Sequence, residues 1–409
     1  AGPSTLRGLV VVPGLPAPRR PREPPLGHHG RVGGGRLALS ALAAVSSRMV
    51  AREVKRPRAA AEKGVANVAS AVPWIGGLAE IVGRYDAILV DLWGVLHNGS
   101  VSFPWAVECL EELHRLGKPV VFLSNSARRR ETNLRSLVKL GIRRELFVDL
   151  VVSGEETWQA LASAKSDKLT RLGGELPLPV MQAERIFVVG NGADDESFLS
   201  GLAPRRATPL AEAQIILARG CETTSGVDGA VATTWKELEV QLAAAAERRM
   251  PMLVANPDFS RPDGTDRPMP GRLARRYVEL GGPPPHLVGK PSRTIFDIAV
   301  ECLRQHGVSE DARLCMVGDS VWHDVRGARG AGLDVVLLCS GIHSEALGVE
   351  QAPAPLSRPS EQHLGDFLGS LPPEELPTYI AAGFAWRGEA WAEPQRPREP
   401  RTEVASGRI

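Results

Sequence analysis

Short apolar segments that alternate with amphipathic ones are the feature that most limits how this chain can fold. The apolar runs, each too short for a core helix, occur at 87–91, 119–123, 185–190, 214–218, 251–255, 313–317 and 334–338. The segments with apolar residues at helical spacing are 105–116, 131–140, 234–248, 271–280 and 293–306. This alternation predicts an α/β fold with a doubly wound, parallel sheet. In that topology, functional groups gather beyond the carboxyl ends of the strands.

The pattern divides the chain into four predicted regions. Residues 66–146 and 268–349 are expected to form one α/β core, and residues 147–267 have strands and helices enough for an inserted α/β domain. Residues 1–65 are a leader rich in Pro, Gly and Arg, which is typical of a disordered tail or a targeting segment. Residues 350–409 are expected to form a Pro-rich C-terminal tail.

Three polar or Pro-rich segments inside these regions have no clear period. They are 166–183, 218–229 and 350–375, and we expect each to be a loop or linker. Residues 376–386, although they lie in the predicted tail, are apolar enough to dock on the core.

The charge of the chain is unevenly distributed. The net charge is +2, but residues 1–60 contain eleven Lys and Arg residues and two acidic ones. The rest of the chain keeps 38 of the 49 basic and 45 of the 47 acidic residues, which argues against a nucleic-acid partner. The Arg-rich, acid-poor leader resembles an organelle transit peptide. A mitochondrial or plastid location and a cytoplasmic one therefore both stay open.

Apolar run lengths and cysteine spacing exclude further classes of protein. No apolar run reaches the roughly 18 residues of a membrane span, so no membrane partner is expected. The five cysteines have no CxxC spacing, which argues against a disulfide framework or a zinc site.

Three carboxylates follow apolar strands. Asp91 closes the run 87–91, and Gly94 permits a tight turn after it. Asp319 and Asp324 flank a turn after the run 313–317. A strand-end carboxylate can act as a nucleophile or a metal ligand, and three together make an oxygen-rich site that suits Mg²⁺.

Polar and basic groups follow two other strands or turns. Ser124 and Asn125 end the next predicted strand, before a helix, where hydroxyl, amide and backbone N–H groups can bind an anion. Lys290 lies in a Gly-Lys-Pro turn and can neutralise phosphate charge. Each of these features alone is commonly just a cap or a turn. Their joint occurrence in this order favours a functional site.

The full set of motifs resembles the haloacid dehalogenase (HAD) superfamily, subfamily IIA, over about residues 80–345. The matching segments are the GVL turn at 94–96, LSN at 123–125, NPD at 256–258, VGKP at 288–291, GDSVWHD at 318–324 and AGL at 331–333. The first motif reads Asp-x-Trp-Gly-Val-Leu-His, as in an uncharacterised branch of that subfamily. The resemblance implies a Rossmann-like HAD core with an inserted α/β cap, and a phosphatase that acts on a small phosphorylated metabolite.

The resemblance also implies a role for each residue of the set. Asp91 is the nucleophile that forms an aspartyl-phosphate. Ser124 and Lys290 hold the transferring phosphoryl group, and Asn125 shapes their loop.

The metal in this family is Mg²⁺. The resemblance assigns its ligands to Asp91, Asp319 and the backbone carbonyl of Trp93, with Asp324 in support. The cation offsets the repulsion between the nucleophile and the phosphate.

Trp93 departs from the family pattern. Most family phosphatases have an aspartate two residues after the nucleophile, and it protonates the leaving oxygen and then activates water. An indole cannot perform this acid–base step. Three readings follow: a substrate whose leaving group needs little protonation, another proton source such as His97 or His323, or a protein that binds a phosphorylated ligand without turnover.

In subfamily IIA the inserted domain is a mobile cap that closes over the site and selects the substrate. Arg219, in the polar segment 218–229, is our candidate for a cap residue that meets an anionic substrate. The resemblance leaves open a homo-oligomer formed through the cap.

Overall fold

The computed structural model describes residues 72–388, except 165, 167, 168, 193, 262–264 and 266. The predicted leader 1–65 lies outside the described residues, and so do the last 21 residues of the predicted tail, 389–409. Among the described residues, no helix combines the length and the apolar character that a bilayer crossing requires.

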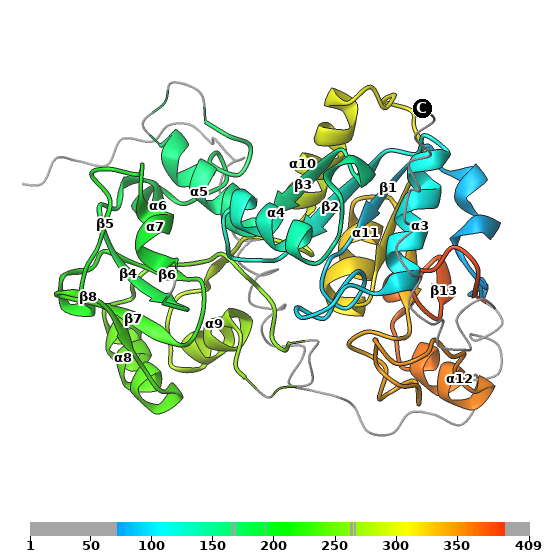
Figure 1. Cartoon of the computed structure of the whole chain (residues 1–409). Coiled ribbons are helices and arrows are strands. Elements are labelled where there is room, and N and C mark those ends of the chain that lie inside the picture. The colour runs from blue at the N-terminus through cyan, green and yellow to red at the C-terminus, as the bar shows by residue number, and fades with distance from the viewer. Residues whose placement is uncertain are drawn as a thin grey trace, which may run out of the picture. The chain divides into compact units, whose positions relative to one another are not determined.

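Within residues 72–388, six parallel strands form the first sheet, in the order β13-β12-β11-β1-β2-β3 (Figure 1). Their bounds are β1 Ala87–Val90, β2 Val120–Ser124, β3 Asp149–Val152, β11 Leu314–Gly318, β12 Asp334–Leu338 and β13 Tyr379–Ala381. The chain starts at β1, runs outward to β3, and later runs outward from β11 on the other side. The reversal lies between β1 and β11, and a crevice forms at their carboxyl ends. The predicted parallel α/β core is confirmed.

Helices cover both faces of the first sheet. Their bounds are α3 Pro104–Arg115, α4 Arg130–Lys139, α10 Arg293–Gln305, α11 Arg326–Gly330 and α12 Glu361–Gly369. Side chains along a strand point alternately to opposite faces. Ile88 of β1 accordingly packs in one cluster with Leu110 of α3, while Leu89 packs in another with Phe296 of α10. Because both faces are covered, the strands are continuous apolar runs.

A second sheet has the order β10-β9-β6-β4-β7-β8 among the described residues, with β5 beside β4. The strand bounds are β4 Arg185–Gly190, β5 Arg206–Ala207, β6 Ile215–Ala218, β7 Thr223–Gly226, β8 Gly229–Ala232, β9 Met252–Val254 and β10 His286–Leu287. The helices around it are α5 Ser153–Ser163, α6 Leu178–Gln182, α7 Asp195–Leu199, α8 Trp235–Glu247 and α9 Pro270–Glu279. We call the segment from α5 to β10 the inserted domain.

The central strands of the second sheet, β4, β6 and β9, are also buried on both faces. Val188 of β4 packs with Leu161 of α5 and Phe198 of α7. The next residue along the strand, Val189, packs with Leu242 of α8 on the opposite face. This is the same alternation as in the first sheet, and it gives the inserted domain an apolar core of its own.

Short helical turns complete the structure at Leu78–Glu80, Val82–Arg84, Arg144–Leu146, Leu210–Glu212 and Pro373–Glu375, with a π-helical turn at Val321–Val325. The π-helical turn directly follows β11, so it lies at the crevice.

The strand pairing corrects the predicted limits of the inserted domain. The sequence pattern predicts the insertion at 147–267, but β3 at 149–152 pairs with β2 in the first sheet. At the other end, β10 at 286–287 pairs with β9 of the second sheet. β10 has only two residues, and Asp149 interrupts the apolar residues around β3, so only their partners show to which sheet they belong.

Three segments predicted as loop or linker contain regular structure. Segment 166–183 contains α6, 218–229 contains β7 and the start of β8, and 350–375 contains α12. The hairpin β7–β8 is rich in small and polar residues, because β8 is an exposed edge strand. These sequences therefore lack the apolar period on which the prediction depended.

The predicted C-terminal tail in fact completes the first sheet. Ile380 of β13 is fully buried and packs with residues of α10 and α12. Its backbone N–H donates to Pro73 O, and its carbonyl accepts from Ile75 N. Residues 376–386 therefore dock on the core, as their apolar composition predicts, and they do so partly as a strand.

We expect Ile380→Ala to lower the free energy of unfolding by about 2–5 kcal/mol, because it leaves a cavity under an edge strand of the sheet. Urea unfolding followed by circular dichroism measures the effect. The control is Val240→Ala on α8, where the side chain is 68% exposed and the change should stay within about 0.5 kcal/mol. Equal, small effects of the two changes would mean that β13 adds little to the core.

Candidate active site

Three buried carboxylates meet at the crevice between the central strands. Asp91 follows β1, Asp319 follows β11, and Asp324 lies in the π-helical turn after it. Their exposed fractions are 8%, 3% and 0%. One carboxylate oxygen from each lies within 4.8 Å of the others. The structure therefore brings together the acidic residues that the sequence singled out.

Lys290 lies between two of these carboxylates. Its Nζ is 2.5 Å from Asp91 Oδ1 and 2.7 Å from Asp324 Oδ1. The side chain is almost wholly buried, so the two ion pairs are shielded from water. A buried ammonium needs such partners, because its desolvation is costly.

The charges of this cluster do not balance. Burial, together with the charge of Asp324, raises the pKa of Asp91 to about 7, although Lys290 acts in the opposite direction. Burial and the two neighbouring carboxylates raise the pKa of Asp319 well above its usual range. Burial disfavours the ammonium of Lys290, but Asp324 and Asp91 outweigh it and raise the pKa of Lys290. When all three carboxylates are ionised, the three carboxylates and the ammonium together carry a charge of −2, which a bound dication would cancel.

Close backbone approach fixes these carboxylates. A Cβ at Gly94, where φ is +86°, or at Gly341 would collide with the Asp319 carboxylate. Ile342 N donates to Asp319 Oδ2 at 2.9 Å, and Ser320 N donates to Asp324 Oδ2 at 3.0 Å. The Oδ1 atoms of Asp319 and Asp324 take no part in these backbone bonds. Carboxylate oxygens are the ligands that a hard cation such as Mg²⁺ prefers.

Asn125 connects three parts of the site. Its Oδ1 accepts from Lys290 N at 2.7 Å, and its Nδ2 donates to Lys290 O at 3.2 Å. The same Nδ2 donates to Asp258 Oδ1 of the inserted domain at 2.8 Å. Gly289 permits this approach, because a Cβ there would meet Asn125 Oδ1 at 2.5 Å. Asn125 therefore positions the lysine loop and does not point freely into the cavity.

Ser124 ends β2 and is 8% exposed. Its Oγ accepts from Ser126 N at 3.3 Å. The hydroxyl lines the same cavity as Asp91 and Lys290, and its proton is available to a bound anion.

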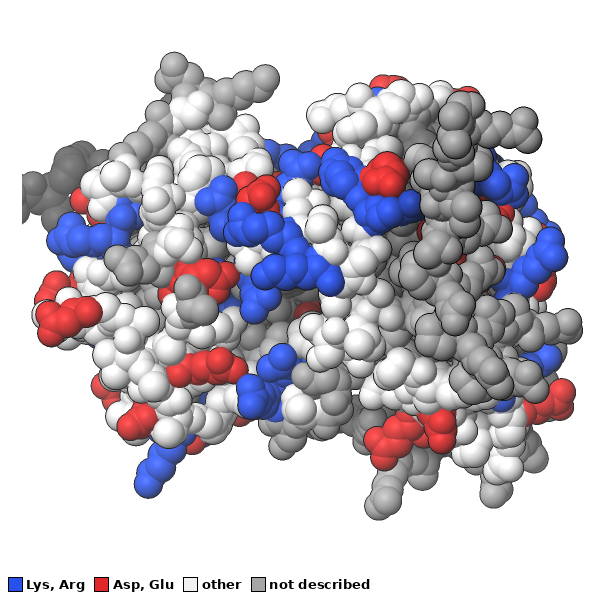
Figure 2. All heavy atoms as spheres, viewed as in Figure 1, with Lys and Arg blue, Asp and Glu red and all other residues white. Residues whose placement is uncertain are grey.

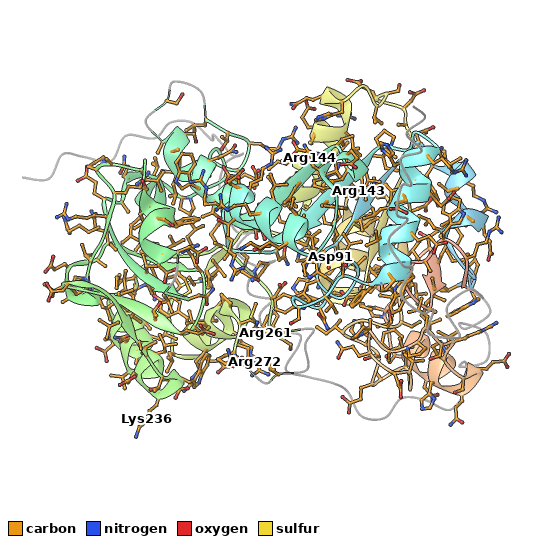
Figure 3. The ribbon with its side chains drawn as sticks, in the orientation of Figure 1. Asp91, Arg143, Arg144, Lys236, Arg261 and Arg272 are labelled. Carbon is orange, nitrogen blue, oxygen red and sulfur yellow. The ribbon has the colours of Figure 1, made fainter. Side chains whose placement is uncertain are left out.

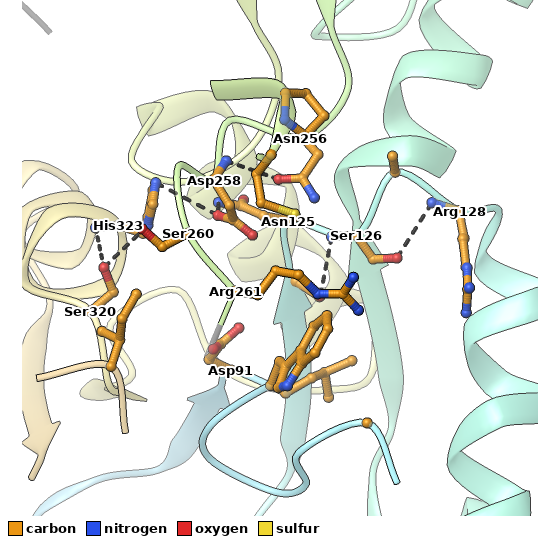
Figure 4. Close-up of a pocket in the computed structure, with 18 of the residues that line it drawn as sticks. Asp91, Asn125, Ser126, Arg128, Asn256, Asp258, Ser260, Arg261, Ser320 and His323 are labelled. Carbon is orange, nitrogen blue, oxygen red and sulfur yellow. Dashed lines mark hydrogen bonds and ion pairs between the residues drawn. The ribbon is translucent and has the colours of Figure 1, made fainter. Parts of the chain in front are cut away.

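A cavity of about 600 Å³ opens above the cluster. The first-sheet side contributes Asp91, Ser124 and Lys290, and the inserted domain contributes the loop from Asn256 to Arg261. Figure 4 shows this loop above Asp91, with Asp258 and Arg261 on it. A small ligand in the cavity would contact both domains.

Asp258 takes part in a chain of polar contacts that the sequence did not reveal. His323 Nε2 is 3.6 Å from Asp258 Oδ1, and His323 Nδ1 is 3.1 Å from Ser320 Oγ (Figure 4). His323 is 8% exposed. The NPD segment therefore joins the inserted domain to the π-helical turn as well as to Asn125.

His97, the other predicted proton source, is held differently. Its Nδ1 accepts a hydrogen bond from Gly99 N at 3.0 Å. Burial lowers the pKa of His97 to about 4, so the imidazole is neutral at pH 7. A neutral imidazole is a weak acid, which disfavours His97 as the missing proton donor.

Trp93 lies in the loop after β1 and lines the cavity half-buried. The guanidinium carbon of Arg261 lies 5.0 Å from the centroid of its ring. No described residue accepts a hydrogen bond from the buried indole Nε1. The indole is therefore positioned by packing and by the cation above it.

Arg219 lines the cavity but is committed to partners within the protein. It is 3% exposed, and its Nη1 is 2.5 Å from Asp195 Oδ1. Its Nη2 donates to Ala127 O, beyond β2, at 3.2 Å, and its guanidinium lies over the Phe198 ring. The contacts with Asp195 and Ala127 suit a positioning role between the domains better than the predicted direct contact with substrate.

Basic side chains gather around α4 on the face shown in Figure 2. Arg129 pairs with Glu155 at 2.7 Å, and Arg130 pairs with Asp149. Arg128 instead lines the cavity with an exposed side chain. Arg128 and Arg261 are two basic residues of the cavity that the sequence did not single out. Their one signal in the sequence is that each lies three residues after a motif, LSN or NPD.

The chain is similar to a group of known proteins. A family model described as haloacid dehalogenase-like hydrolase matches residues 88–199, and a second HAD-hydrolase-like model matches residues 287–358. Chronophin from Homo sapiens is 29% identical over 276 residues, which are 65% of this chain and 84% of chronophin. The 4-nitrophenylphosphatase of Schizosaccharomyces pombe is 24% identical over 271 residues, which are 65% of this chain and 87% of that protein.

Among solved structures, a haloacid dehalogenase-like hydrolase from Brucella suis 1330 is 27% identical, with a TM-score of 0.55. The match covers 68% of this chain and 95% of the Brucella suis chain. The two family models match around Asp91 and Ser124 at one end and around Lys290, Asp319 and Asp324 at the other. The chain belongs to the haloacid dehalogenase-like hydrolases.

Proposed function

We propose that this protein is a Mg²⁺-dependent phosphatase that hydrolyses a small phosphorylated metabolite through a phosphoryl group on Asp91. The observation that carries the proposal is the buried cluster itself. A strand-end carboxylate, a lysine and two further carboxylates meet at the floor of one cavity. The chain's similarity to relatives such as 4-nitrophenylphosphatase supports the same reaction class.

The reaction begins when an Asp91 carboxylate oxygen attacks phosphorus. The bond from phosphorus to the leaving oxygen breaks, and an aspartyl-phosphate forms. Water then attacks this phosphorus, releases inorganic phosphate and restores the Asp91 carboxylate. Asp91 is buried and already oriented, so little reorganisation is needed.

Lys290 and Ser124 line the place of the phosphoryl group. When phosphate enters, the Lys290 ammonium can share its hydrogen bonds between Asp91 and the phosphoryl oxygens. Ser124 offers a hydroxyl proton, and Asn125 keeps the lysine loop in place through both of its amide atoms.

Asp91, Asp319, Asp324 and the backbone carbonyl of Trp93 are the groups that would hold Mg²⁺. When bound, the dication supplies the positive charge that lets an anionic nucleophile approach an anionic phosphate. The charge of −2 on the described cluster fits this cation.

The inserted domain is proposed to act as a lid that excludes water and selects the substrate. The contacts from Asp258 to Asn125 and from Arg219 to Ala127 join it to the floor of the site. These bonds would have to break and reform if the domain opens to admit substrate.

Asp91→Asn should reduce Mg²⁺-dependent release of 4-nitrophenol from 4-nitrophenyl phosphate to the background rate, because an amide cannot form the aspartyl-phosphate. Absorbance of the released phenolate measures the rate. Asp366→Asn, at an exposed position of α12, is the matched control and should keep full activity. A wild-type protein that binds phosphate or vanadate with Mg²⁺ but turns over no ester of a broad panel would favour a silent phospho-ligand binder instead.

Mg²⁺ should raise the melting temperature more at about pH 8 than at about pH 5.5. The pKa of Asp91 is raised from 3.8 to about 7, so protons compete with the cation below neutrality. In the metal-free protein, the same raised pKa stabilises the fold at low pH. That contribution is lost as the pH rises from about 4 to about 7.

Scanning calorimetry with Mg²⁺ or EDTA at both pH values measures this linkage. Asp319→Asn should remove most of the Mg²⁺ effect, and Asp366→Asn should retain it. A Mg²⁺ shift that is independent of pH and of Asp319 would place the cation elsewhere.

Trp93→Asp should raise kcat/KM for an alkyl phosphate such as glycerol phosphate by at least about tenfold, since a general acid contributes about 10²–10⁴-fold. Trp93→Asn is the control, because it shortens the side chain equally but supplies no proton. A phosphate-release assay on both variants decides the question. Equal rates for the two variants would contradict the view that a missing acid limits alkyl-ester hydrolysis.

A further inference from the structure

The indole that replaces the usual acid is covered by a cation from the other domain. Figure 3 labels Arg261 and Asp91, which come from the loop after β9 and from the end of β1. The guanidinium of Arg261 lies on the ring of Trp93, two residues from Asp91, and all three residues line one cavity. A positively charged side chain therefore covers the position at which most relatives have the general acid.

In-line attack fixes which side of the cavity the leaving group occupies. The attacking and leaving oxygens lie on opposite sides of phosphorus. Asp91 is at the floor, so the leaving oxygen faces the loop of the inserted domain that contains Asp258 and Arg261. Side chains of this loop are the ones that can respond to charge on the leaving oxygen.

The other described cations that the inserted domain contributes to the cavity are placed differently. Arg219 is buried against Asp195 at 2.5 Å. Arg267 is 67% exposed and lies 3.6 Å from Glu222. Only Arg261 of these three lies on the residue that takes the place of the acid.

We propose that Arg261 is a catalytic residue that contacts the leaving oxygen and stabilises its developing negative charge. This inference rests on the phosphatase function proposed above. Asp91 forms the bond to phosphorus, the bond to the leaving oxygen breaks, and its electron pair stays on that oxygen as an anion beside the guanidinium. The anion takes a proton from water after departure, because arginine keeps its protons at any ordinary pH.

Charge stabilisation without proton transfer selects a class of substrate. Esters and anhydrides whose leaving groups are stable anions, namely aryl and acyl phosphates, are favoured. Simple alkyl phosphates are poor substrates. Trp93 contributes by holding the guanidinium over the site through a cation–π contact.

The test is a series of substituted phenyl phosphates whose phenols cover a range of pKa, assayed with the full-length protein and Mg²⁺. The variants are Arg261→Ala, Arg261→Lys and, as a matched control away from the cavity, Arg206→Ala on the exposed strand β5 of the inserted domain. We expect Arg261→Ala to lower kcat/KM for phenyl phosphate by about 10²–10³-fold, as for the loss of an oxyanion donor. The loss for 4-nitrophenyl phosphate should be much smaller, so that log(kcat/KM) depends more steeply on phenol pKa.

Arg261→Lys should restore part of the shallow dependence of log(kcat/KM) on phenol pKa, and Arg206→Ala should leave that dependence unchanged. The wild-type pH profile should show no loss of activity on the alkaline side up to about pH 9, since no general acid has to stay protonated. A parallel loss across the whole phenol series in Arg261→Ala would overturn the proposal and leave only a binding or structural role. Absence of turnover in the wild-type protein would instead refute the phosphatase function itself.

Discussion

The ammonium of Lys290, buried between Asp91 and Asp324, is the interaction on which the site depends. It joins the end of β1 to the turn after β11. Lys290 is 199 positions from Asp91 in sequence and 34 positions from Asp324. Burying an ammonium is costly unless carboxylates surround it, and burying carboxylates is costly unless cations do. Each buried charge therefore offsets part of the desolvation cost of the others. The sheet reversal between β1 and β11 is what brings them to one point.

Much of this arrangement could be predicted from the sequence. The apolar runs at 185–190 and 334–338 coincide with β4 and β12, because strands buried on both faces must be apolar throughout. Asp91, Lys290, Asp319 and Asp324 could be placed near one another, since each follows a strand or turn at the same edge of the predicted sheet. Local pattern and topology agree at these positions.

The remaining features of the fold and the site depend on contacts between residues far apart in sequence, which a local sequence pattern does not reveal. Strand β13 has three residues inside the apolar segment 376–386, whose composition does not distinguish a strand from a docked loop, and β10 has only two residues. Arg261 and Asp258 belong to a loop, and only the packing of the inserted domain brings them over Trp93 and Asn125. Arg219, predicted to meet an anionic substrate, is instead buried in an ion pair with Asp195.

The pairing of β1 with β11 has a consequence for the order of folding during synthesis. Ala87 pairs with Leu314, so the central pair of the first sheet must wait until the ribosome has made both partners. The strands of the inserted domain lie between Arg185 and Leu287 and can pair with one another earlier. Nascent chains generally fold domain by domain from the N-terminal side. Every strand of the inserted domain is therefore synthesised before β11. If the inserted domain folds first, it shortens the loop that must close when β1 pairs with β11.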